Sequence, residues 1–226
     1  MTYIISVGGS LIVPAEGIDA KFLSDFSLFI NKQVQQGNKF LIVAGGGVTA
    51  RQYVKAANQV QKIPIEEQDW LGIHATRLNA HLLKTVLLDI AHPEIITNPE
   101  KNLISQSSVI IASGYRPGYS TDYVAVLLAK KYKTDIIINL SNIDQVYDQD
   151  PKKFSQAKKI KEISWTEFRK IIGYQWKPGL NTPFDPIASA LAEKLKLKVV
   201  VINGKNIKNI ENCLDGKKYI GSLICN

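Results

Sequence analysis

The chain has 226 residues, of which 45% are hydrophobic and 21% are charged, so it is long enough to bury a substantial core without a disulfide or a structural metal. Its longest apolar runs have strand length and end at a charge, Gly or Pro, whereas a membrane span needs roughly 20 apolar residues. The two cysteines have neither metal-ligand nor redox spacing, and no secretory signal pattern is present, so we expect a cytoplasmic protein without a membrane partner.

The formal net charge of +8 lies entirely in the second half of the chain. Residues 1–112 carry nine Lys or Arg and nine Asp or Glu, whereas residues 113–226 carry nineteen and eleven. The densest cluster consists of five lysines: Lys152, Lys153, Lys158, Lys159 and Lys161. Such a cluster is typical of contact with nucleic acid, of attraction for a polyanionic nucleotide, or of a solvated surface. Because it lacks the interleaved aromatic side chains of single-strand binders, we favour the solvated surface and expect no nucleic-acid partner.

Apolar, β-branched runs bounded by turn residues predict five strands. They lie at 3–7, 39–44, 108–112, 135–140 and 198–202. Because the stretches between them have helical periodicity, the connections are crossovers and the sheet is mainly parallel. The sequence therefore predicts an α/β fold, a three-layer sandwich in which helices flank a central sheet.

Six helices are expected between and after these strands, each from its apolar stripe or its cap. The first carries the apolar stripe Phe22, Phe26, Phe29, Ile30 and Val34, the second begins near Val48 and holds Arg51, and the third, within 66–91, places Leu71, Leu78, Leu82 and Val86 at core spacing. The fourth starts at Ser120 or Thr121, and the fifth runs from the capping box at Ser164 to Gly173. The sixth follows Asp185-Pro186 and covers 187–195. The phenylalanine stripe of the first helix suits a core or a subunit interface equally.

Two glycine turns are the features most suggestive of function. Gly8-Gly9-Ser10 follows the first strand, and Gly45-Gly46-Gly47 follows the second and precedes a helix. Glycines at such a position permit positive φ and close approach of a ligand, and the free N–H groups at a helix start attract anions. Neither turn matches the P-loop or the dinucleotide-binding pattern, and each alone also suits an ordinary tight turn. Together they predict two adjacent phosphate-binding sites at the carboxyl ends of neighbouring strands, as in a kinase.

A third segment follows the third strand and leads directly into a helix: Ser113-Gly114-Tyr115-Arg116-Pro117-Gly118-Tyr119-Ser120-Thr121-Asp122. It offers glycines, hydroxyls, an arginine and a helix start, which together suit a phosphorylated acceptor. Thr121 and Asp122 equally suit simple helix caps. The irregular segment 174–184 is expected to be an active-site flap rather than a slack connection.

The fourth segment runs from Asn139 to Pro151. Its last ten residues, Asn142 to Pro151, have the pattern Asn-x-Asp-x-Val-Tyr-x-x-Asp-Pro. The chain resembles the amino acid kinase superfamily, and most closely its archaeal-type uridylate kinases. The resemblance rests on four motifs that occur in the family's order: Gly-Gly-Ser, Gly-Gly-Gly followed by Arg51, Thr-Asp-x-x-Ala from Thr121, and the motif 142–151. The similarity extends from Gly8 to the ending 221–224 and includes the helical segment 69–80. It implies transfer of the ATP γ-phosphate to UMP with Mg²⁺, which is held mainly by the nucleotide phosphates, and no resident metal site.

The resemblance also assigns roles to residues. Those implied to be catalytic are Arg51, Asp122 and Lys177. Those implied to bind ATP are Gly8, Gly9, Ser10, Gly47, Arg51, Ser141, Asn142, Tyr147 and Asp150. Those implied to bind UMP are Gly46, Asp69, Tyr115, Arg116, Pro117, Gly118, Tyr119, Ser120 and Thr121. It further implies one domain over 1–226, with an acceptor lobe at about 1–133 and an ATP lobe at about 134–226, and a hexamer built as a trimer of dimers.

Three positions depart from the family pattern. Ser6 stands where much of the superfamily has lysine, Gln145 replaces the glycine of Asp-Gly-Val-Tyr, and the flap 176–184 carries two prolines and two large aromatic residues. These departures keep two alternatives open. One is a kinase of the same fold with another acceptor, such as isopentenyl phosphate, carbamate or a carboxylate. The other is a nucleotide-binding protein without turnover.

Overall fold

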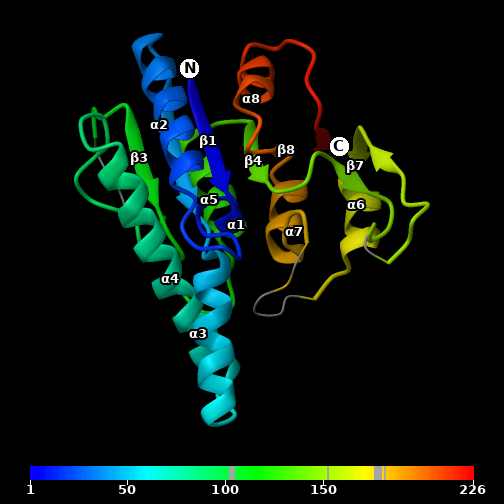
Figure 1. The fold of residues 1–226 in the computed structure, drawn as a ribbon. Helices are drawn as coiled ribbons and strands as arrows, with labels where there is room; N and C mark the ends of the chain where they lie inside the picture. The colour runs from blue at the N-terminus through cyan, green and yellow to red at the C-terminus, as the bar shows by residue number, and fades with distance from the viewer. Residues whose placement is uncertain (102–104, 152, 176–179, 181) are drawn as a thin grey trace.

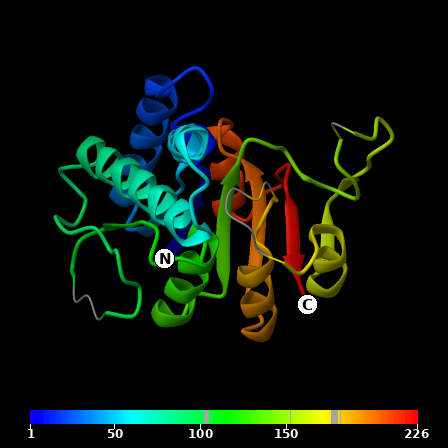
Figure 2. The same cartoon turned by 90° about the horizontal axis from the view of Figure 1, so that it is seen from below.

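A seven-stranded sheet forms the centre of the protein (Figure 1). The computed structural model describes residues 1–101, 105–151, 153–175, 180 and 182–226. The strands of this sheet are β1 (Thr2–Val7), β2 (Lys39–Ala44), β3 (Val109–Ala112), β4 (Ile136–Ser141), β7 (Glu162–Ser164), β8 (Lys198–Asn203) and β9 (Ser222–Cys225). Their order is β3-β2-β1-β4-β8-β9-β7, and Figure 2 shows β4, β8 and β9 side by side in green, orange and red.

The five predicted strands are the five parallel strands of this sheet. β1 pairs in parallel with β2 and β4, β2 with β3, and β4 with β8. β9 runs antiparallel to β8, and β7 is parallel to β9. The predicted α/β fold with a mainly parallel sheet is therefore confirmed.

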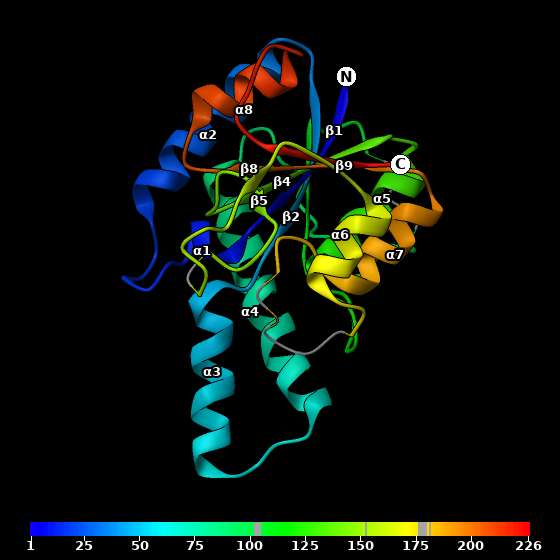
Figure 3. The same ribbon diagram turned by 90° about the vertical axis from the view of Figure 1, so that its right-hand side faces the viewer.

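The helices form the outer layers. They are α1 (Gly9–Ile12), α2 (Ala20–Gln35), α3 (Gly47–Val60), α4 (Ile65–Val86), α5 (Thr121–Tyr132), α6 (Trp165–Ile172), α7 (Pro186–Lys194) and α8 (Ile207–Leu214). Figure 3 shows α2 and α8 on one side of the sheet and α5, α6 and α7 on the other. Two hydrophobic clusters match these faces, one containing Phe26 of α2 and Ile210 of α8, the other Val124 of α5 and Ala188 of α7.

The apolar stripe of α2 belongs to the core. Phe22, Phe26 and Phe29 are at most 4% exposed and pack against strands β1 and β2 within one cluster. The stripe is therefore not a free surface for a second subunit. No helix of the described residues is both long enough and apolar enough to span a bilayer.

Capping residues define the helix starts as predicted. Ser120, Ser164 and Asp185 each accept a hydrogen bond from a backbone N–H in the first turn of α5, α6 and α7 respectively. Asp19 does the same for α2. Gly173, with φ of 82°, ends α6.

The predicted core stripe of α4 is only partly correct, because Leu82 packs against the core but two of the other three residues are exposed. Leu78 is 65% exposed and Val86 36% exposed, whereas the buried face of α4 includes Ile73, Thr76 and Asn79. Thr76 and Asn79 are buried because they hydrogen-bond to the backbone of two neighbouring loops. Apolar periodicity alone misplaces a helix face whose buried positions are partly polar.

The sequence patterns do not predict β7, β9 or the separate hairpin of β5 (Val146–Tyr147) and β6 (Lys159–Ile160), because strands of two to four residues are too short to alternate. Ser222, at the start of β9, ties the hairpin to the main sheet. Its hydroxyl accepts a hydrogen bond from the Val146 amide, at 2.8 Å, and donates one to the Ile160 carbonyl.

Helix α3 and the first half of α4 project from one end of the domain (Figure 1; Figure 3). Within α3 only Gly47 is buried, and Tyr53 and Val60 are 62% and 86% exposed. The two helices pack on each other, so one long face of α3 lines the space between them.

We predict that Ser222→Ala lowers the free energy of unfolding by about 1–3 kcal/mol, because it leaves the buried Val146 amide without an acceptor. Urea unfolding followed by circular dichroism measures the change. Ser155→Ala, on the exposed side of the same hairpin, is the control and should change the stability by less than about 0.5 kcal/mol. Equal stabilities of the two variants would show that this hydroxyl does not hold the hairpin.

Candidate active site

The two predicted glycine turns lie against each other. A Cβ atom on Gly9 would be 2.6 Å from the Cα of Gly47 and 2.7 Å from the carbonyl carbon of Gly45. Gly47 has φ of +66°, the left-handed conformation that glycine adopts without strain. The two turns are therefore in direct contact, and both glycines are required by close approach of the backbone.

A buried asparagine holds the second turn in place. Asn79 of α4 donates hydrogen bonds from Nδ2 to the carbonyl oxygens of Gly45, at 2.8 Å, and Gly46, at 3.2 Å. The turn is also held from the other side, because the Val48 amide in the first turn of α3 donates to the Val13 carbonyl at 3.0 Å.

A cavity of about 420 Å³ opens beside the glycine turns. It is formed by the start of α3, the first half of α4, the loop before α5 and the start of α7. Its lining residues are Gly46, Gly47, Ala50, Arg51, Val54, Lys55, Gln68, Asp69, Gly72, Ile73, Thr76, Gly114, Tyr119, Ser120, Thr121, Asp122, Leu180, Thr182 and Asp185. Eight of the predicted site residues thus meet in one cavity: Gly46, Gly47, Arg51, Asp69, Tyr119, Ser120, Thr121 and Asp122.

The loop before α5 is fixed to α4 at two points. The Gly114 amide donates to Oγ1 of Thr76 at 2.8 Å, and the Gly118 amide donates to Oδ2 of Asp69 at 2.7 Å. Burial raises the pKa of Asp69 above its ordinary value, although the hydrogen bond from Gly118 opposes this rise.

An arginine between two tyrosines stiffens the same loop. The guanidinium carbon of Arg116 lies 5.0 Å from the ring centres of both Tyr115 and Tyr119, a cation–π arrangement. Tyr115 donates from its hydroxyl to Glu100 at 2.7 Å. Of these predicted acceptor-binding residues, Tyr119 lines the cavity, whereas Tyr115 and Arg116 support it from outside, as do Pro117 and Gly118.

Two carboxyl groups meet at the inner end of the cavity. Asp122 accepts hydrogen bonds from the Ser6 hydroxyl, at 3.2 Å, and from the Asp185 amide, at 3.1 Å. Asp185 accepts from the Ser120 hydroxyl and, through its other oxygen, from the first-turn amides of α7. Burial, and then the charge of Asp185, raise the pKa of Asp122 to about 7; burial raises the pKa of Asp185 as well.

Ser6 and Gln145, which depart from the family pattern, are accommodated in different ways. Ser6 is 2% exposed and its hydroxyl donates to Asp122 at 3.2 Å. Gln145 does not adopt a positive φ, so glycine is not required there, and its Nε2 donates to the Gly221 carbonyl at 3.0 Å.

The residues predicted to bind ATP lie along the carboxyl ends of β1 and β4. The Gly8 amide donates to the Leu140 carbonyl at 2.8 Å, which places Gly8, Gly9 and Ser10 next to Ser141 and Asn142. Tyr147 lies on β5, and Asp150 follows in the loop to β6. Asp144, in the loop between β4 and β5, accepts from Asn203 at 2.9 Å and pairs with Lys159 at 3.6 Å. The predicted catalytic Lys177, like Lys152 of the basic cluster, lies outside the described residues.

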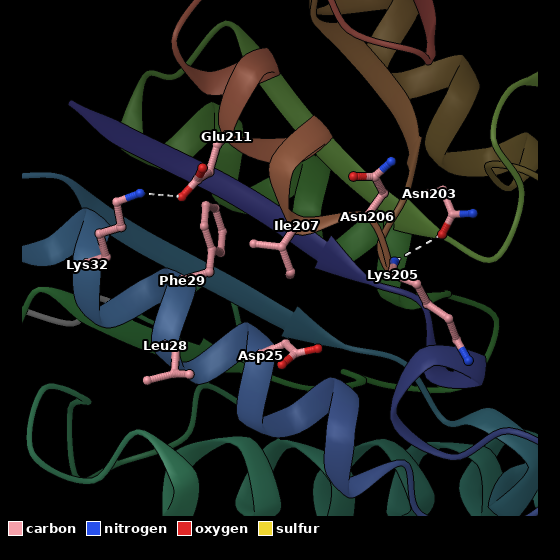
Figure 4. A pocket seen from close by; sticks show the side chains of 9 residues that line it. All are labelled: Asp25, Leu28, Phe29, Lys32, Asn203, Lys205, Asn206, Ile207 and Glu211. Atoms are coloured by element: carbon pink, nitrogen blue, oxygen red, sulfur yellow. Dashed lines mark hydrogen bonds and ion pairs between the residues drawn. The ribbon is translucent and has the colours of Figure 1, made fainter.

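A second, more open groove runs between α2 and α8, with a volume of about 640 Å³ (Figure 4). Its floor includes Phe29 and Ile207, and the ion pair of Lys32 with Glu211, at 2.7 Å, connects the two helices. Lys205, at the other end of the groove, pairs with Asp19 at 3.2 Å. Both lysines of this groove are thus neutralised within the chain.

The cavity contains residues to which the sequence prediction gave no role in the site, among them Lys55, Gln68 and Asp185, whereas Gly114 and Thr76 lie within the predicted segments 113–122 and 69–80. Lys55 follows the predicted arginine by four residues, so helical spacing places the two cations on one face and gives a usable signal. Asp185 is predicted only as a helix cap. Its hydrogen bond from Ser120, in the loop before α5, has no signal in the sequence.

The fold and site define the class: an α/β protein with two adjoining glycine turns beside a cationic helix face. The amino acid kinase family profile matches residues 1–203. The chain is 33% identical to the uridylate kinase of Pyrococcus abyssi over 222 residues, covering 96% of each chain, and 36% identical to that of Sulfurisphaera tokodaii over 199 residues, covering 86% of this chain and 87% of the relative. The chain belongs to the amino acid kinase family.

Solved structures agree with this assignment. The crystal structure of uridylate kinase from Archaeoglobus fulgidus matches with a TM-score of 0.82 and 32% identity, over 100% of both chains. The UMP kinase of Bacillus anthracis, at a TM-score of 0.78 and 21% identity over 99% of this chain and 95% of that one, shows the fold alone. The predicted resemblance to the family is confirmed.

We predict that Gly9→Ala lowers the free energy of unfolding by about 1–3 kcal/mol, because the added methyl group must push the two glycine turns apart. Thermal unfolding measures the loss. Gly72→Ala is the control: its methyl group meets no atom within 4 Å, and alanine in a helix is about 0.5–1 kcal/mol more favourable than glycine. A Gly9→Ala protein as stable as the wild type would contradict the close contact of the turns.

We also predict a pH dependence from Asp122. Its raised pKa means that between roughly pH 4 and pH 7 the folded protein holds a proton that the unfolded chain has released. Stability from this group therefore falls as the pH rises through that range. Asp122→Asn removes the titration, so its stability relative to the wild type should increase from pH 5 to pH 8 in urea unfolding. Asp89→Asn, at an exposed position, is the control, and a constant difference for Asp122→Asn would refute the prediction.

Proposed function

We propose that the protein transfers the γ-phosphoryl group of ATP to UMP, forming UDP and ADP. The observation that carries this proposal is the contact of the two glycine turns beside Arg51, which supplies adjacent sites for a donor and an acceptor phosphate. The relatives named as uridylate kinases, similar over most of their length, support UMP as the acceptor.

Phosphoryl transfer requires alignment of donor and acceptor and neutralisation of the charge on the transferred group, rather than a nucleophilic side chain. In the proposed complex the amides of Gly9 and Gly47 face the phosphates, and Arg51 lies beside the transferred group. Lys177 is assigned a second positive charge on the flap. Asp122 orients these groups from the inner end of the cavity.

The acceptor site is proposed to be the cavity of about 420 Å³. Gly46 would hold the UMP phosphate beside Arg51 at the start of α3, and Asp69 would face the ribose. Tyr119, Ser120 and Thr121 would contact the base or the phosphate. The loop 115–118 is fixed by Arg116 and by Asp69, so it would meet the ligand already formed.

The donor site is proposed along β1 and β4. Gly8, Gly9, Ser10 and Gly47 would bind the triphosphate, and Ser141, Asn142, Tyr147 and Asp150 would bind the adenosine. No group of three or more His, Cys, Asp or Glu side chains in the described parts of the chain is arranged to hold a metal ion. Mg²⁺ would therefore be carried mainly by the phosphate oxygens, where it neutralises charge.

Four broader assignments complete the proposal. The acceptor lobe would comprise about residues 1–133 and the ATP lobe about 134–226. The protein would assemble as a hexamer, a trimer of dimers, for which the exposed face of α3 with Tyr53 and Val60 offers an apolar contact surface. It would act in the cytoplasm, in pyrimidine nucleotide synthesis.

Release of ADP tests the function directly. We expect release from ATP and Mg²⁺ with UMP, and at least tenfold less with CMP, isopentenyl phosphate or N-acetylglutamate. Release with another acceptor alone would replace UMP by that acceptor. ATP binding without release in any mixture would favour a nucleotide-binding protein without turnover.

We predict that Arg51→Gln lowers kcat/KM for UMP by about 10²–10³, because it removes a positive charge from the transferred group. Circular dichroism should be unchanged, since Arg51 is exposed and makes no ion pair with the described residues. Arg77→Gln, on α4 outside the cavity lining, is the control. A variant with near wild-type turnover would remove Arg51 from the mechanism.

A further inference from the structure

Helix α3 presents one continuous face to the acceptor cavity. The lining residues from this helix are Gly47, Ala50, Arg51, Val54 and Lys55, which follow the spacing of a single helical face. Lys55 is therefore a second cation of the cavity, one turn further from the glycine turn than Arg51.

Arg51 and Lys55 form no ion pair with any residue that the structure describes. The groove between α2 and α8 differs in this respect, because Lys32 and Lys205 each have a carboxylate partner there. Like charges four residues apart also disfavour a helix slightly. Two cations kept adjacent and without partners beside a cavity suit an anionic ligand.

The acidic groups of the cavity do not neutralise these cations. Asp69 accepts a hydrogen bond from the Gly118 amide. At the inner end of the cavity, Asp122 accepts one from the Asp185 amide and Asp185 accepts one from the Ser120 hydroxyl. A phosphate monoester carries about −1.5 to −2 charges at pH 7. Arg51 and Lys55 together carry the charge that such a monoester requires.

We propose that Lys55 is a second acceptor-binding cation, which attracts the phosphate-bearing acceptor into the cavity and holds it beside Arg51. This inference rests on the proposed function and adds to it a residue that governs acceptor affinity. Because Lys55 lies further from the glycine turns than Arg51, it acts on binding of the acceptor rather than on the transferred group.

The test compares Lys55→Gln with the wild type in UMP binding by calorimetry and in initial rates with ATP and Mg²⁺. We expect Kd and KM for UMP to rise about tenfold, the effect of losing one hydrogen bond to a charged group, with the loss in KM rather than in kcat. Lys55→Arg should restore most of the affinity. Lys62→Gln, an exposed change of the same charge just beyond α3, should leave both constants unchanged.

Two further measurements separate charge capture from a structural effect. The difference between wild type and Lys55→Gln should shrink as salt rises from 0.05 M to 0.5 M, because salt screens the attraction. Uridine, which lacks the phosphate, should inhibit both proteins equally. The inference would be overturned, and the proposed function left standing, if Lys55→Gln did not change Kd and KM for UMP. The same holds if Lys55→Gln weakened inhibition by uridine as much as it weakened binding of UMP. A wild-type protein that neither binds nor phosphorylates UMP would instead overturn the proposed function.

Discussion

The contact between Gly9 and Gly47 is the constraint on which the rest of the site depends. It requires two positions without side chains, one of them in a left-handed conformation, and it brings the ends of β1 and β2 together above the sheet. Asn79 secures one turn through its carbonyls, and the Gly8 amide joins the other to β4. The site is thus built from main chain, and side chains are added at its border.

Charge is distributed unequally around this main-chain centre. Arg51 and Lys55 of α3 line the outer wall of the cavity and have no ion-pair partner among the described residues, whereas at its inner end Asp185 is buried and Asp122 is half-buried. The Ser6 hydroxyl donates to Asp122 there. Burial and the charge of Asp185 raise the pKa of Asp122, which favours its protonated form.

Much of this arrangement could be predicted from the sequence, because strands, caps and glycine turns are local features. The five parallel strands, the three N-caps and the two glycine turns follow from such features. The α4 face could not be predicted, since Thr76 and Asn79 are buried for the sake of distant loops. The link from Asp185 to Ser120 also joins segments 65 residues apart, and β7 and β9 are too short to be recognised without each other. The family resemblance supplied the roles of individual residues, which spacing alone does not give.

The position of β9 has a consequence for how the chain is made. This strand lies between β8 and β7, so β7 and α6, though some sixty residues earlier in the chain, have no place in the sheet until residues 222–225 have been synthesised. The sheet therefore cannot close until these residues have emerged from the ribosome. Strands β1, β2 and β3 can pair before β9 is synthesised, whereas the pairing of β7 with β9 is non-local and comes late.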